Sequence, residues 1–267
     1  MRQLSISAAW DETKVVLAHE GGLLATVALA LIVLPQVVMA VAGVPVGPES
    51  TMLSRLVYMA VVLLGLVAQV ALNRLAIPPP VMVRDAIATG LVRLLPVVLV
   101  LLALMIMVVL TTVALAIPLN AAGLTAMRTS GQPPLSVVAV LLVLVALSFA
   151  IIQLIFPVAA VETGNPIRLV SRSWQLTRGN YLRLLAFIVI VFVGLGLVLI
   201  ASQVGLGSVI VLLLGQPHSG SMSALVLGLI AGLLQAAFTT VTAVMLARIY
   251  LQLSGGQAQA SVPSSGT

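Results

Sequence analysis

The chain has 267 residues, of which 61% are hydrophobic and 7% are charged, and its mean hydropathy is +1.28. Water-soluble domains carry roughly a quarter of their residues as charged side chains, so this composition excludes a soluble globular protein and indicates a chain solvated by lipid. The net charge of +6 comes from cations that lie between apolar runs, which points to membrane topology and away from nucleic-acid binding. The absence of cysteine excludes disulfides, thiol catalysis and cysteine-ligated metals.

The first 21 residues do not have the pattern of a secretory signal peptide. A signal follows its basic start directly with an apolar run, whereas Asp11, Glu12 and Lys14 come first here. Apolar residues recur at helical spacing in this stretch, and we expect Trp10 to lie at the depth of the lipid headgroups. The pattern predicts a cytoplasmic amphipathic segment over residues 1–21.

Six apolar runs follow, and each is long enough to cross about 30 Å of hydrocarbon. Pro35 predicts a kink in the first run. The prolines at 78–80 end the second run and force an extended connection. We therefore predict an all-α polytopic membrane protein with a transmembrane domain over residues 22–253, whose spans lie at about 22–44, 52–73, 94–118, 135–161, 182–214 and 222–253.

The last two runs differ from the others. The fifth is too long for one straight span, and Gln203, Gly205, Gly207 and Ser208 predict a break near its far end. After the sixth, residues 254–267 are rich in Ser, Gly and Gln and predict a disordered cytoplasmic tail.

Two more amphipathic stretches precede the third and fifth spans. The first carries Arg84, Asp85 and Arg93, and the second, residues 162–185, holds four of the twelve basic residues. Read as a helix that begins after Pro166, the second stretch sets apolar side chains against arginines, a pattern typical of a helix on a membrane surface. An amphipathic segment, a span, a loop and a returning span thus recur three times. Short similarities between span ends favour a threefold repeat, and chance matching in apolar sequence is the alternative.

The cations predict the orientation of the chain. With six spans, ten of the twelve cations fall on one side, and only Arg55 and Arg128 fall on the other. The positive-inside rule then places both termini in the cytoplasm, with the protein in a bacterial inner membrane.

The arginines of residues 162–185 form the first candidate site. A guanidinium pairs bidentately with phosphate, so this group predicts a binding site for anionic lipid headgroups. The other reading, which the pattern favours, is plain positive-inside anchoring on anionic lipid. The predicted headgroup residues are Arg168, Arg172, Arg178, Arg183 and Trp174.

Two acids, Asp85 and Glu162, each follow a span and precede an amphipathic stretch. As a functional pair they would bind a cation or gate the cytoplasmic face. As structural residues they would offset the positive end of a helix dipole, which is the reading we favour.

The sixth span carries small residues at four-residue spacing, which lets another helix approach closely. The partner is either a neighbouring span, which we favour, or a second copy of the chain or another protein. The predicted packing residues are Ala224, Gly228, Gly232 and Ala236.

Glutamines occur inside several spans, and Gln69, Gln153 and Gln235 are the predicted polar interior. They would line a polar path or bond between helices. No acid or base lies deep in a predicted span, which argues against an ion-coupled transporter. No nucleotide-binding, metal or hydrolase motif occurs, so we predict no catalytic residue, no metal and no cofactor.

The run Pro157–Glu162, followed by Pro166, Ser171–Trp174 and Leu176–Asn180, resembles the membrane-domain family of glycerophosphoryl diester phosphodiesterase. The resemblance implies a helical membrane protein, here a stand-alone bacterial member without the catalytic domain. That domain needs clustered acids and histidines, and the chain has only His19 and His218.

The leading functional hypothesis is a non-enzymatic inner-membrane protein that engages anionic lipid as a scaffold or accessory in lipid or envelope processes. The second is a small transporter or exporter subunit that uses the glutamine-lined interior. The third is a membrane enzyme that acts on a lipid headgroup.

Overall fold

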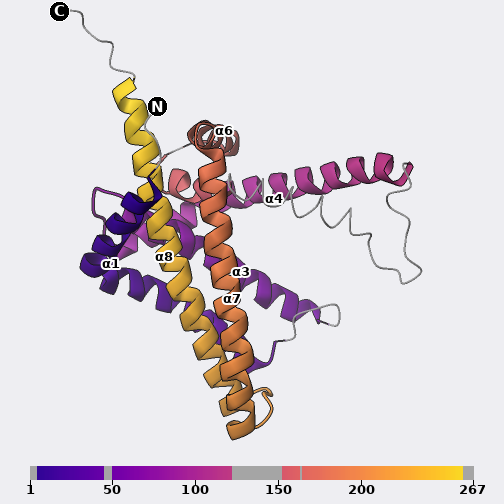
Figure 1. Cartoon of the computed structure of the whole chain (residues 1–267). Coiled ribbons are helices and arrows are strands. Elements are labelled where there is room, and N and C mark those ends of the chain that lie inside the picture. The colour runs from indigo at the N-terminus through magenta and orange to yellow at the C-terminus, as the bar shows by residue number, and fades with distance from the viewer. Residues whose placement is uncertain (1–4, 45–49, 122–151, 163, 261–267) are drawn as a thin grey trace, which may run out of the picture.

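The computed structural model describes residues 5–44, 50–121, 152–162 and 164–260, and every regular element within them is a helix (Figure 1). Five helical stretches are long and apolar enough to cross a membrane: Ile6–Ala42, Met52–Ala76, Val83–Leu115, Tyr181–Leu214 and Met222–Gly255. This is the make-up of a multi-pass membrane protein. The helices are α1 (Ile6–Ala28), η1 (Leu29–Val33), α2 (Leu34–Ala42), α3 (Met52–Ala76), α4 (Val83–Ala121), an unlabelled helix Ile152–Val161, α6 (Pro166–Thr177), α7 (Tyr181–Leu214) and α8 (Met222–Ala260).

The predicted surface segment 1–21 and the first span form one helical stretch over the described residues. Ser5 begins it, because its side chain accepts a hydrogen bond from the backbone N–H of Ala8. No proline or competing cap lies between the two parts, and a helix satisfies its own backbone both in headgroups and in hydrocarbon. The stretch therefore continues until Gly43, whose left-handed backbone (φ 61°) closes α2.

The irregularity in this stretch lies just before Pro35. Residues Leu29–Val33 form a π-helical turn, and α2 begins at Leu34 with Pro35 in its first turn. Proline has no N–H and its ring crowds the carbonyl four residues earlier, so the preceding turn has to widen or bend.

Three other boundaries differ from the sequence predictions. The second amphipathic stretch and the third span are joined in α4. The predicted break in the fifth run is wrong, because α7 is continuous through residues 203–208. Glycine costs a helix only about 1 kcal/mol, which is less than leaving backbone groups unpaired in lipid. The predicted tail begins too early, since α8 continues to Ala260.

The fourth predicted span, residues 135–161, lies mostly outside the described residues. Its described end is the short apolar helix Ile152–Val161, which is buried except at its last residue and at the partly exposed Ile152.

Helix α8 lies at the centre of the described bundle. It contacts α1, η1, α2, α3, α6 and α7. Its buried core is richest near the carboxyl end, where Ala243, Leu246 and Ile249 are fully buried. Helix α4 instead packs mainly on α3, and its far end extends away from the other helices (Figure 1).

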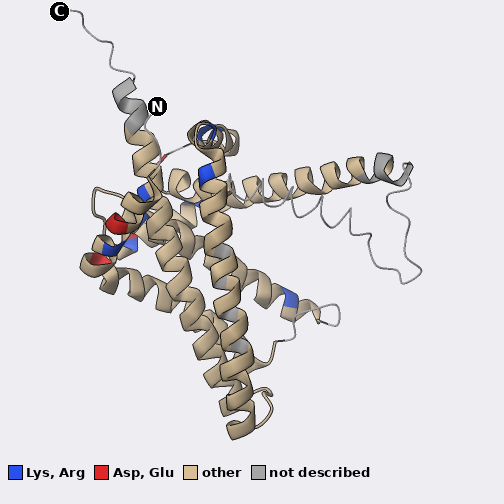
Figure 2. Ribbon diagram, viewed as in Figure 1, with Lys and Arg blue, Asp and Glu red and all other residues tan. Residues whose placement is uncertain are grey.

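Charged side chains gather at one end of the described molecule. Figure 2 shows most of them in the upper half of the view, on α6, at the beginning of α7 and around α1. Arg55 lies in the first turn of α3. The run 184–247, which forms most of α7 and α8, contains no Lys, Arg, Asp or Glu.

Candidate functional site

Helix α6 is a short separate helix between the end of helix 152–161 and the beginning of α7. Pro166 occupies its first turn, where its missing N–H costs no hydrogen bond. The helix ends at Thr177, and Asn180 precedes α7. Figure 1 shows α6 nearly end-on, whereas α7 runs from the top to the bottom of the view. Helix α6 therefore lies crosswise at the beginning of α7.

Three faces follow one another around α6. One packs on the protein through Leu169, Ser173, Leu176 and Thr177, which are all buried. The next is apolar yet open, with Ile167 82% exposed and Trp174 47% exposed. The third is polar and carries Arg168, Ser171 and Gln175, which are exposed. An exposed apolar face beside an exposed cationic face is what a helix at a lipid–water boundary requires.

The four predicted headgroup arginines fall into two separate recesses. Arg168 and Arg172 line one of about 540 Å³, together with Ser171 and Gln175. The other, of about 370 Å³, lies at the turn between α6 and α7. It is lined by Arg178, Gly179, Asn180, Tyr181, Leu182 and Arg183.

Arg172 is held in an ion pair, which distinguishes it from Arg168. Its Nε donates to Oε1 of Glu162 at 2.9 Å, and the hydroxyl of Tyr250 donates to the same oxygen at 3.0 Å. The network ties α6 to helix 152–161 and to α8, and we call it the Glu162 latch. The guanidinium of Arg168 has no hydrogen-bond or ion-pair partner within the described part of the chain, so its charge is uncompensated there.

The structure does not bring Asp85 and Glu162 into one site. Asp85 lies exposed in the first turn of α4, where a negative charge offsets the helix dipole. Glu162 instead serves the latch.

The small residues of the last span pack inside the chain. A Cβ added at Gly228 would lie 2.6 Å from Cβ of Ala40, and one added at Gly232 would lie 3.2 Å from Cα of Val33. Ala224 and Ala236, on the same stripe, are each 5% exposed. This stripe therefore lets α8 approach α2 and η1 closely.

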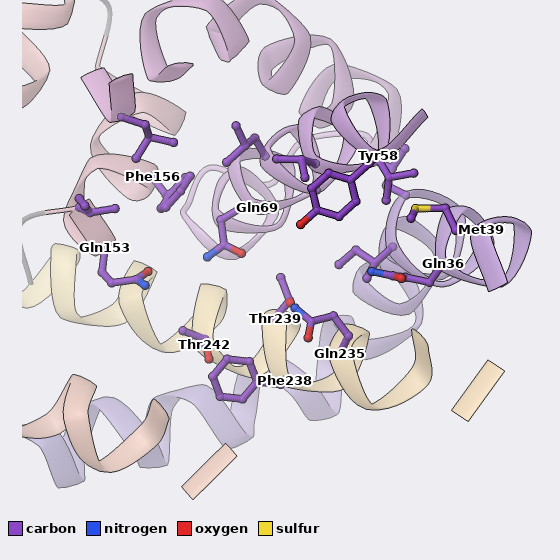
Figure 3. Close-up of a pocket in the computed structure, with 18 residues that line it drawn as sticks. Gln36, Met39, Tyr58, Gln69, Gln153, Phe156, Gln235, Phe238, Thr239 and Thr242 are labelled. Carbon is purple, nitrogen blue, oxygen red and sulfur yellow. The ribbon is translucent and has the colours of Figure 1, made fainter. Parts of the chain in front are cut away.

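The three predicted interior glutamines line one cavity of about 570 Å³, and Gln36 joins them. Gln36 comes from α2, Gln69 from α3, Gln153 from helix 152–161 and Gln235 from α8. Figure 3 shows their amides and the hydroxyl of Tyr58 directed toward the same space. On α3 the lining positions Tyr58, Val61, Val62, Gly65, Leu66 and Gln69 follow helical periodicity, so one face of this helix forms a wall.

Sequence reasoning missed the residues that close the charged end of α3. Nη1 of Arg74 donates to the carbonyls of Ile77 (3.0 Å) and Pro79 (3.2 Å), and Nη2 of Arg248 donates to that of Ala76 (3.1 Å). These carbonyls have no helical partner, so the two arginines act as a cap. Their positions at the ends of spans two and six were the only signal. Tyr250, two residues after Arg248, was also missed, because its position at the end of span six was the only signal.

No group of three or more His, Cys, Asp or Glu side chains gathers among the described residues in a way that would hold a metal ion. Comparisons with protein-family models, with curated protein sequences and with solved structures find no match. The likeness to the phosphodiesterase membrane-domain family therefore rests on the residues quoted for it and stays a prediction.

Proposed function

We propose that this protein binds anionic phospholipid headgroups at its charged end through α6, as a non-enzymatic scaffold or accessory in lipid or envelope processes of a bacterial inner membrane. The observation that carries the proposal is the pair of exposed faces on α6: one apolar, with Ile167 and Trp174, and one cationic, with Arg168. The buried face of α6, with Leu169 and Leu176, fixes the helix to the protein, so the two exposed faces keep a constant direction.

The energetics favour anionic lipid over neutral lipid. Burying a large apolar side chain such as that of Ile167 in lipid yields roughly 1.5–3 kcal/mol, and this gain is the same for any headgroup. A cation near an anionic surface adds about 1 kcal/mol. Selectivity for charge therefore comes from the arginines, while the apolar face supplies general membrane affinity.

Arg168 is the arginine best placed to meet a phosphate. It lines the larger recess beside Ser171 and Gln175, which offer a hydroxyl and an amide to the same ligand. Arg172 belongs to the Glu162 latch and holds α6 in position. Arg178 and Arg183, at the turn into α7, are assigned to a neighbouring headgroup.

Trp174 provides a direct test, because the chain has only two tryptophans. Trp10→Phe leaves Trp174 as the single tryptophan, and the protein is reconstituted with brominated phosphatidylglycerol or brominated phosphatidylcholine. Stronger quenching by phosphatidylglycerol is expected. Arg168→Gln should lower this preference by roughly fivefold, the equivalent of about 1 kcal/mol. Arg55→Gln, at the other end of α3, is the matched control and should change nothing.

Equal quenching of Trp174 by the two lipids in the parent chain would overturn the proposal. An unchanged preference in Arg168→Gln would overturn the assignment of that residue. Turnover of either lipid by the purified protein would replace the proposal with the enzymatic alternative.

The same proposal includes the finer topology. We propose six spans, with residues 135–161 as the fourth, three surface segments in a threefold repeat, and both termini in the cytoplasm. The placement of charges at one end of the described helices supports this orientation (Figure 2).

A further inference from the structure

The glutamine cavity contains a buried polar group that lacks a partner. Within residues 5–44, 50–121, 152–162 and 164–260, the buried hydroxyl of Thr242, which lines the cavity, has no hydrogen-bond partner. Leaving such a group unpaired costs roughly 1–3 kcal/mol, so this hydroxyl calls for a polar partner inside the cavity. Gln153, which also lines the cavity, is 6% exposed and turns its amide toward the same space (Figure 3).

The cavity wall selects against charge. Among the described residues that line it, none is Asp, Glu, Lys, Arg or His, and their polar groups are the four amides and the hydroxyls of Tyr58, Thr239 and Thr242. Each amide both donates and accepts, so the wall offers both kinds of hydrogen bond. A charged ligand would lose its hydration with no opposite charge in return. The ligand that fits is therefore uncharged.

The remaining wall is apolar and one side of the cavity is open. Tyr58 and Val62 of α3 both line it, yet they are 45% and 41% exposed. From Tyr58 to Gln69 the helix rises about 16 Å, roughly half the hydrocarbon thickness of a bilayer. The opening thus lies along an exposed face of α3, one of the helices long and apolar enough to cross a membrane.

We infer that this cavity binds the polar head of an uncharged amphiphile, a molecule with hydroxyl or amide groups attached to an alkyl chain. The head bonds to the glutamines, and the chain leaves past Tyr58 into the bilayer. The volume of about 570 Å³ lies within the range of small-molecule sites. The inference is independent of the proposed function, since the cavity shares no residue with the α6 recesses.

The test uses two probes with the same photoreactive alkyl chain: a monoacylglycerol, which is uncharged, and a lysophosphatidic acid, which adds a phosphate. Each is mixed into phosphatidylcholine vesicles that hold the full chain, irradiated, and the labelled peptides are identified by mass spectrometry. The monoacylglycerol should label peptides of α3 and α8 that line the cavity, and the lysophosphatidic acid should not. Gln153→Leu with Gln235→Leu should reduce this labelling at least about fivefold, as expected for the loss of one to two hydrogen bonds.

A second variant blocks the cavity without touching its polar groups. Gly65 lines the wall, and a Cβ added there meets nothing within 4 Å, so a Gly65→Leu side chain begins in open space and should take up ligand space. Gly196→Leu in α7, where a Cβ also meets nothing within 4 Å, is the matched control. Gln252→Leu, in α8 and outside the cavity lining, is the control for loss of an amide.

Loss of labelling in Gly65→Leu and in the glutamine pair, with both controls unchanged, supports the inference. Three outcomes overturn it: cavity peptides labelled no more than the surface near Gly196, equal labelling by the phosphate probe, or labelling that survives both variants. None of these outcomes bears on the quenching of Trp174 by anionic lipid, so the two proposals fail separately.

Discussion

At the scale of single residues, the arginines of the charged end differ in what they do. Arg74 and Arg248 bond to carbonyls that the end of α3 leaves without helical partners. Arg172 is neutralised by Glu162. The guanidinium of Arg168 has no protein partner among the described residues, and sequence spacing alone did not separate Arg168 from Arg172.

The Glu162 latch gives the first prediction at this scale. Glu162→Gln or Arg172→Gln should each lower the free energy of unfolding by roughly 1 kcal/mol, because both side chains are about one-third exposed and solvent screens the pair. Thermal unfolding in detergent of the two single variants and the double variant measures their coupling. If the losses of unfolding free energy in the two single variants add up to the loss in the double variant, the ion pair itself contributes nothing to stability. The preference of Trp174 for phosphatidylglycerol should also be larger in the Arg172→Gln variant than in the Arg168→Gln variant.

At the scale of elements, two helix crossings depend on glycine. At Gly90 of α4 an added Cβ would lie 2.7 Å from the carbonyl oxygen of Val67 in α3, and at Gly228 of α8 it would lie 2.6 Å from Cβ of Ala40. Backbones this close leave no room for a methyl group.

Gly90→Ala and Gly228→Ala should therefore each destabilise the protein by about 1–3 kcal/mol through overpacking. Gly196→Ala, at an open helical position, should be neutral or stabilising by up to about 1 kcal/mol. The midpoint of thermal unfolding in one detergent compares the three. A stable Gly90→Ala variant would mean that α3 and α4 do not cross closely there.

Five of the six predicted apolar runs correspond to long apolar helices among the described residues, but the sequence predicted the junctions of these helices poorly. Thr51 caps α3 and Pro166 starts α6, since local chemistry determines both beginnings. The merger of the surface stretches with the spans in α1 and α4 was not predicted, because amphipathic and apolar segments are equally good helices where no breaker separates them. Likewise, the spacing of the glutamines identified polar positions on three helices, but only the packing of those helices shows that they face one cavity.

At the scale of the whole molecule, the charged end and the loop between α7 and α8 lie on opposite sides of the spans that we propose. The loop between α7 and α8 contains His218 and Ser219 and carries no Lys, Arg, Asp or Glu. The turn between α6 and α7 and the end of α8 belong to the charged end (Figure 2).

The natural absence of cysteine makes this arrangement directly measurable. Ser219→Cys should react with a membrane-impermeant maleimide in intact spheroplasts. Asn180→Cys and Ser254→Cys should react only after permeabilisation, because the positive-inside rule places their end in the cytoplasm. Labelling of all three from the same side would contradict the crossing of α7 and α8, and the inverse pattern would reverse the orientation.

The π-helical turn at Leu29–Val33 gives the first span an unusual tolerance to changes in chain length. Such a turn holds one residue more than an α-helical turn, so removing a single residue inside it restores regular geometry and leaves the flanking faces in their present phase. Removing one residue from the interior of α1 instead rotates the two sides of the deletion by about 100° relative to each other, so α1 and Gln36 cannot both keep their contacts. A scan of one-residue deletions should therefore spare this turn alone, which makes it the place where homologous chains can differ in length by one without losing their packing.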